Sequence, residues 1–112
     1  MSAYYLIENI GTVQSKPALV IQATALDLPK PSASLQVVVS GTSGSCSATV
    51  QWLGGNDGVN FINLGSVVAT TSNAAVANGT NGAVSQVPWL FYAAYLSAVS
   101  GTGASVNAIM GV

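Results

Sequence analysis

Residues 47–64 read SATVQWLGGNDGVNFINL, and this stretch decides the fold. Ala48, Val50 and Trp52 alternate with polar residues, so an extended chain places all three side chains on one face. The GGNDG sequence at 54–58 is typical of a tight turn, because Asn, Asp and Gly tolerate positive φ angles. The FINL sequence that ends the stretch returns as a second strand. The stretch therefore predicts a β-hairpin with one buried face.

Short apolar or alternating runs separated by turn residues continue beyond this hairpin. Further strands are expected at 35–40, at 67–71, weakly at 75–77, at 89–99 and at 104–112, with turns at 41–46, 78–82 and 100–103. The 89–99 strand is apolar on both faces and is expected to be central. Seven or eight short strands predict an all-β protein: an antiparallel β-sandwich, jelly-roll or Greek-key-like, in a single domain. The pairing order stays open.

The first part of the chain differs from the rest, because it holds most of the charges and prolines. We expect residues 1–33 to be an N-terminal extended segment, an arm that contributes one or two strands, and residues 34–112 to be the β-sandwich core. The strand candidates in this segment are Tyr4–Ile7 and Leu19–Thr24. Leu28-Pro29-Lys30-Pro31 is expected to form a stiff joint. The sequence leaves open whether the segment is an arm or part of the sandwich.

Large apolar and aromatic side chains cluster near the N-terminus, where chains are usually loose unless docked. They either cover the domain's own core or add to the edge of a partner's sheet. The candidate interface residues of the chain are Tyr4, Tyr5, Leu6, Ile7, Pro29 and Pro31.

Charged residues are scarce. The chain has only Glu8, Lys16, Asp27, Lys30 and Asp57, and it has no Arg and no His. Metal sites and acid–base catalysis depend on His and carboxylates, and nucleic-acid binding depends on Lys and Arg. We therefore predict no enzyme, no catalytic, metal or cofactor-binding residues, no cofactor and no nucleic-acid partner.

No membrane partner is expected either. The longest apolar stretch, Val87–Val99, has about 13 residues and includes a proline, whereas a spanning helix needs roughly 20. No basic region precedes an apolar run at the N-terminus, so we expect no signal peptide. The lone Cys46 has no His to activate it, which favours a structural thiol that is buried or half exposed.

Two motifs have both a functional and a structural interpretation. The GGNDG loop could suggest a calcium site, but Asp57 is its only carboxylate, so a hairpin turn is favoured. The aromatic residues Trp52, Trp89, Tyr92 and Tyr95 could form a platform for sugar. For Trp52, which shares a face with Ala48 and Val50, core packing is the favoured interpretation.

The order and spacing of several motifs between Ser47 and Val112 resemble small virion proteins of tailed bacteriophages, of the capsid decoration (cement) type. The motifs are ATVQW at 48–52, GNDGVNFINLG at 55–65, VPW at 87–89, AYL at 94–96, SGTGA at 100–104 and MGV at 110–112. Related sequences often have Trp where this chain has Phe61, and a basic residue near Ala93 or Ala94. The first 33 residues share none of these motifs.

The resemblance implies a structural β-sandwich that binds the outer capsid surface of the virion and reinforces contacts between major capsid protein subunits. It implies the major capsid protein and the chain itself as partners, as a homo-oligomer with a dimer favoured, made in the bacterial host cytoplasm. The alternatives are a tail or head-fibre component of the virion, a carbohydrate-binding β-sandwich module and a secreted adhesive or surface-layer module.

Overall fold

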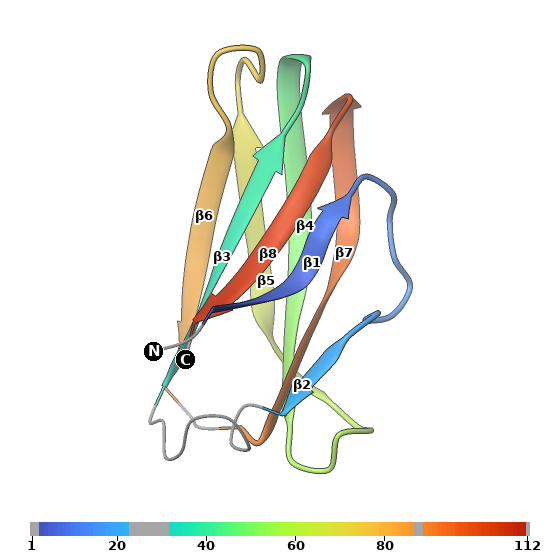
Figure 1. Ribbon diagram of the computed structural model, residues 1–112, viewed down its shortest axis with the longest axis vertical. Helices are drawn as coiled ribbons and strands as arrows, with labels where there is room; N and C mark the ends of the chain where they lie inside the picture. Colours follow the sequence, from blue (N-terminus) through green and yellow to red (C-terminus); the bar gives the residue numbers. More distant parts are fainter. Residues whose placement is uncertain (1–2, 23–31, 87–88, 112) are drawn as a thin grey trace.

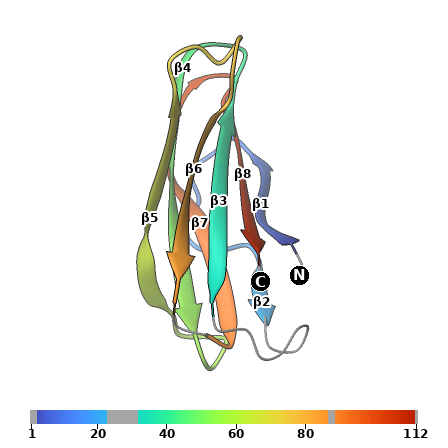
Figure 2. The same cartoon turned by 90° about the vertical axis from the view of Figure 1, so that its left-hand side faces the viewer.

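The computed structural model describes residues 3–22, 32–86 and 89–111. These residues form two antiparallel four-stranded sheets that lie face to face, which confirms the predicted sandwich (Figures 1 and 2). The strands are β1 (Ala3–Ile10), β2 (Val20–Gln22), β3 (Ala33–Ser40), β4 (Ser43–Gly55), β5 (Ile62–Thr71), β6 (Gly79–Ser85), β7 (Phe91–Thr102) and β8 (Ser105–Gly111).

The strand order is that of a jelly roll. The first strand pairs with the last and so on inward: β1 pairs with β8, β2 with β7, β3 with β6 and β4 with β5. These four pairs together form one long antiparallel ribbon. The β4–β5 hairpin is the tip of that ribbon. Rolling the ribbon up sets β3 beside β8 and β4 beside β7, giving the sheet orders β1-β8-β3-β6 and β2-β7-β4-β5.

The core lies between the two sheets and follows from period-two alternation. Buried and less buried residues alternate along β3, β4 and β8, as expected for strands with one face against the core. The inward side chains of these strands are Ala33, Leu35, Val37, Val39, Cys46, Ala48, Val50, Trp52, Val106, Ala108 and Met110. Trp52 is therefore a core residue, and its ring stacks on Tyr92 with ring centroids 5.8 Å apart.

Strand β7 is an inner strand of its sheet, as the sequence predicted, and adjacent residues Tyr92, Ala93 and Ala94 are all buried. It begins at Phe91, so the two residues before it belong to the connection that leads into the strand. Beyond the short β2, Gln14 continues the pairing with β7. Its main-chain N–H donates to Leu96 O (2.8 Å), and its side-chain Oε1 accepts from Leu96 N–H (3.0 Å).

Two predictions between β5 and β6 were wrong. The expected strand at 75–77 is a turn, because Asn73 accepts main-chain hydrogen bonds from Ala75, Val76 and Ala77 through its side-chain and carbonyl oxygens. The expected turn at 78–82 is instead the start of β6. A side-chain carbon at Gly79 would overlap the main chain of β5, so this glycine permits a close approach that composition alone does not reveal.

Two other strand boundaries differ from those that the sequence predicted. The loop expected at 41–46 shrinks to two residues because β4 already begins at Ser43. The strands expected at 61–64 and 67–71 are one continuous strand, β5, with a register shift against β4 near Gly65. Cys46 is buried, one of the two placements that the sequence left open. Its Sγ fills space beside Gly41 and Gly101 that a side chain at either position would occupy.

The two long sides of the sandwich differ. On one side β5 and β6 approach each other, and Asn81 Nδ2 donates to Val68 O at 2.9 Å. On the other side lie the edge strands β1 and β2, one in each sheet (Figure 1). The N-terminal segment thus contributes two strands and is part of the sandwich over its described residues.

Substitutions at Trp52 test the packing of the core. Trp52→Ala is expected to lower the free energy of unfolding by about 3–5 kcal/mol. Trp52→Phe is expected to cost clearly less, since Phe retains stacking on Tyr92 and removes a buried indole N–H that has no partner among the described residues. Urea unfolding followed by circular dichroism measures both, and equal losses would contradict this account of Trp52.

Candidate functional site

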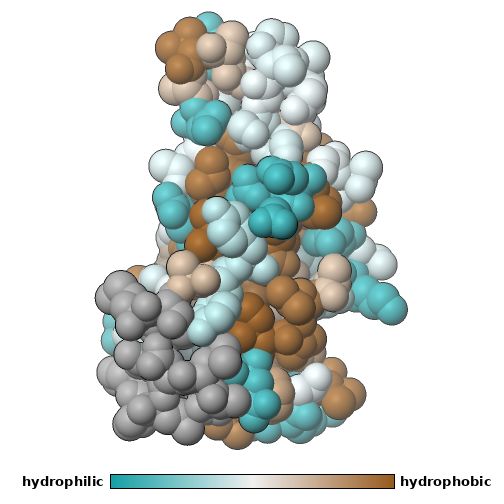
Figure 3. All heavy atoms as spheres, viewed as in Figure 1, coloured by the Kyte–Doolittle hydropathy of each residue, from teal (hydrophilic) through white to brown (hydrophobic). Residues whose placement is uncertain are grey.

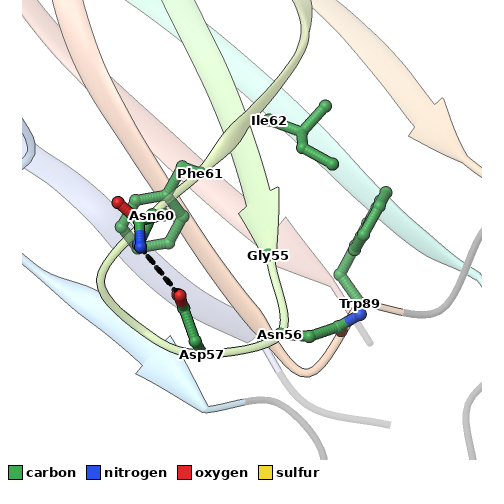
Figure 4. Close-up of a pocket in the computed structure, with 7 residues that line it drawn as sticks. All are labelled: Gly55, Asn56, Asp57, Asn60, Phe61, Ile62 and Trp89. Carbon is green, nitrogen blue, oxygen red and sulfur yellow. Dashed lines mark hydrogen bonds between the residues drawn. The ribbon is translucent and has the colours of Figure 1, made fainter.

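A hollow of about 400 Å³ lies at the end of the sandwich where β4 turns into β5. Figure 4 shows Trp89 and Ile62 on one side of it and Phe61, Asn60 and Asp57 on the other. The described residues that line it are Gly55, Asn56, Asp57, Asn60, Phe61, Ile62 and Trp89. The hollow therefore combines flat apolar walls with amide and carboxylate groups.

The loop between β4 and β5 is shaped by Asp57. Its Oδ1 accepts hydrogen bonds from the main-chain N–H groups of Val59 (2.9 Å) and Asn60 (2.8 Å), and its Oδ2 accepts one from Asn60 Nδ2 (2.9 Å). Gly58 follows with a φ of 77°, a left-handed conformation that glycine adopts without strain. These three bonds hold the carboxylate in the turn, which agrees with the hairpin turn that the sequence favoured.

These hydrogen bonds also set the charge of the loop. The main-chain N–H groups of Val59 and Asn60, with the Asn60 side chain, lower the pKa of Asp57 from 3.8 to about 2. Asp57 is consequently ionised throughout the neutral and mildly acidic range. The hollow carries one fixed negative charge.

Trp89 reaches the hollow because of the register between β4 and β7. Gly54 pairs with Tyr92 and Gly55 with Phe91, so the residues just before β7 lie beside the end of β4. A side-chain carbon at Gly54 would come within 2.8 Å of Trp89 Cγ and Cδ1, which means that the indole covers this glycine directly.

Hydrogen bonds fix the connection that carries Trp89. Its main-chain N–H donates to Tyr92 Oη (3.2 Å), and the N–H of Leu90 donates to Asn56 Oδ1 (3.2 Å), which ties the connection to the β4–β5 loop. The Nε1 of Trp89 is buried and has no partner among the residues that the structure describes. The indole therefore offers hydrocarbon surface rather than its N–H to the hollow.

The sequence singled out the loop and Trp89 separately but did not predict that they form one hollow. It indicated a turn at the GGNDG loop and placed Trp89 among possible sugar-platform residues, together with Trp52, Tyr92 and Tyr95. The structure buries Trp52 and Tyr92 in the core and leaves Tyr95 partly buried, so Trp89 alone of the four lines the hollow. Only the β4–β7 register brings Trp89 to the loop.

The candidate interface residues divide between core and edge. Leu6 and Ile7 are buried in the protein's own core, so their side chains are not available to a partner. Tyr4 is partly buried against that core, and Tyr5 is half exposed on β1. The candidates Pro29 and Pro31 lie outside the described residues.

Besides Tyr5, the side of the sandwich formed by residues 3–22 exposes three further large apolar side chains. We call it the N-terminal edge and define it by four side chains, Tyr5 (48% exposed), Val13 (58%), Leu19 (46%) and Val20 (40%). β1 and β2 are both end strands in the strand orders of the described residues, so the edge also presents main-chain groups on one side of each sheet.

The described ranges lack two kinds of feature. Within 3–22, 32–86 and 89–111, no three His, Cys, Asp or Glu side chains are grouped so that they could hold a metal ion. The same residues contain no helix with the length and apolar character needed to cross a membrane.

Comparisons with protein-family models, curated proteins and solved structures found no match.

The carboxylate of Asp57 gives a pH-dependent prediction. Its folded pKa lies below its unfolded value, so the unfolded state binds more protons and stability rises with pH. This contribution is present above about pH 4 and is lost as the pH falls toward 2. An NMR titration should place the midpoint for the Asp57 carboxyl carbon at about 2. Asp57→Asn should remove this part of the acid sensitivity, and a midpoint near the ordinary value would contradict the role of the loop hydrogen bonds.

The contact between Gly54 and Trp89 gives a second prediction. Gly54→Ala should lower the free energy of unfolding by about 1–3 kcal/mol, because the new methyl group collides with the indole. In a Trp52→Phe background, Trp89 is the only tryptophan and its emission should shift. In a double-mutant cycle, Trp89→Ala should relieve most of the penalty. An unchanged penalty would show that the methyl group collides with something else.

Proposed function

We propose that this protein is a structural component of a bacteriophage virion, which binds the outer capsid surface and reinforces contacts between major capsid protein subunits. In this proposal the protein forms a homo-oligomer, with a dimer favoured, and is made in the bacterial host cytoplasm. It draws support from the order of motifs in β4–β5 and β7–β8 and from the character of the surface. It assigns the protein no enzymatic role.

The N-terminal edge is the single observation that carries the proposal. Tyr5, Val13, Leu19 and Val20 are exposed along the side where both sheets end in β1 and β2. Main-chain groups on an edge strand can add to a partner's sheet, while neighbouring apolar side chains supply buried area. Figure 3, in the view of Figure 1, shows hydrophobic residues gathered in the lower half of this face and mixed with hydrophilic residues above.

The scarcity of charge determines what kind of contact this surface can make. Glu8 and Lys16 are the only charged residues in the described segment 3–22. Interfaces formed there depend on apolar burial and hydrogen bonds, which salt screens little. The absence of strong like-charge repulsion also permits many copies to lie close together.

Repeated attachment over the capsid would make the total binding strong. One edge of this size makes a modest interface, but a capsid offers the same site at every equivalent joint between subunits. If an oligomer attaches at two points, the second attachment is intramolecular and benefits from a high effective concentration. A small, nearly uncharged sandwich can in this way hold neighbouring capsid subunits together against internal pressure.

Co-sedimentation with shells assembled from the major capsid protein of the same phage tests the proposal. The protein should pellet with the shells at a fixed ratio to capsid subunits, with little change between about 50 mM and about 500 mM NaCl. Val20→Asp should weaken binding by about tenfold or more, because it places a charge in an apolar contact. Val84→Asp, at an exposed valine on β6, is the matched control and should bind normally.

Three results would count against this assignment. Release by moderate salt would contradict apolar docking, and equal effects of the two Asp variants would exclude the N-terminal edge. A copy number in purified virions far below that of the capsid subunits would favour a tail or head-fibre component instead.

A further inference from the structure

We propose that the hollow formed by the β4–β5 loop and Trp89 binds a neutral sugar unit of a glycan. This inference goes beyond capsid attachment and concerns a different set of residues. The sugar would lie between Trp89 and Ile62 on one side and Phe61, Asn60 and Asp57 on the other (Figure 4).

The chemistry of the walls matches a ligand that is apolar on its faces and polar at its rim. Trp89 and Phe61 provide flat hydrocarbon surface on which the C–H groups of a pyranose ring can pack. Asn56, Asp57 and Asn60 provide planar amide and carboxylate groups that can bond adjacent hydroxyls. Few polar groups around an apolar hollow are characteristic of small-ligand sites.

Hydrogen-bonding capacity remains on this rim. Asn56 uses Oδ1 to accept from Leu90, and Asn60 uses Nδ2 to donate to Asp57. Among the described residues, Asn56 Nδ2 and Asn60 Oδ1 make no hydrogen bond, so one donor and one acceptor are available. Both side chains are already held in place by their other atom, which lowers the entropy cost of binding.

The negative charge of Asp57 favours a neutral ligand over an acidic one. Among the described residues that line the hollow, only Asp57 is charged, and its carboxylate is ionised at neutral pH. An acidic sugar or a phosphate would meet this charge with no Lys or Arg among the lining residues to offset it. A neutral hydroxyl-rich ring can instead donate hydrogen bonds to the carboxylate.

The size of the hollow favours one or two sugar units over a protein surface. Its volume of about 400 Å³ is at the lower end of the range for small-ligand pockets. Stable protein–protein contacts bury about 800 Å² on each partner, far more than this lining offers. The test must therefore distinguish glycan binding from a protein contact at this end of the sandwich.

Native affinity electrophoresis provides the test. The folded protein would be run through gels containing dextran, mannan, galactomannan or xylan, with polygalacturonate and heparin as acidic probes. Retardation is expected in at least one neutral polymer and not in the acidic ones. Trp89→Ala should weaken that interaction by about tenfold, since it removes the stacking surface.

Matched variants keep the test independent of folding. Val59→Ala changes an exposed residue of the same loop that does not line the hollow, and should bind as the wild type does. Because Trp89 also packs against the core, Ile62→Ala and Asn60→Ala provide second variants at exposed lining positions, each expected to weaken binding severalfold. Urea unfolding verifies that each variant is folded.

Several outcomes would overturn the inference. These are no retardation in any neutral polymer, retardation only in acidic polymers, or retardation that folded Trp89, Ile62 and Asn60 variants retain. Loss of shell binding in the Trp89 variant without any glycan binding would identify this end as a protein contact. Since the shell assay depends on Val20, either proposal can fail while the other stands.

Discussion

The antiparallel pairing of β4 with both β5 and β7 is the constraint on which the rest of the structure depends. It places Ala48, Val50 and Trp52 against the opposite sheet, and a slip of one residue would turn them all toward solvent. The same register pairs Gly55 with Phe91, which brings Trp89 over Gly54. The core and the hollow at its end are therefore consequences of one alignment.

Short polar side chains take the place of charges in stabilising this fold. Asp57 and Asn73 accept main-chain hydrogen bonds within their own turns, and Asn63 accepts one from Gly65 at the register shift of β5. Asn81 and Gln14 bond main-chain atoms of other segments. Such bonds satisfy main-chain groups that the sheets leave unpaired. Because these groups are neutral except for Asp57, the fold leaves the surface with little electrostatic character, which limits the partners it can attract from a distance.

The sequence predicted the local features better than the assembled ones. Strict alternation located β3, β4 and the core position of Trp52, because burial on one face leaves a period-two pattern. The turn predicted at 78–82 was wrong because Asn and Gly favour turns by propensity, whereas Gly79 is needed where β6 crosses close to β5. The hollow was not predicted, since residues 56 and 89 meet only through the β4–β7 register, which no local pattern encodes.

The two proposed binding surfaces have one physical consequence in common. With few charges to steer association, the N-terminal edge and the hollow act mainly at contact, so encounter is slow and each single contact is weak. A shallow site lined by a few polar groups then gains strength mainly by being displayed in many copies at once. A capsid lattice provides such a display. Attachment through the N-terminal edge would leave the β4–β5 end, which other strands form, as a separate surface repeated over the particle.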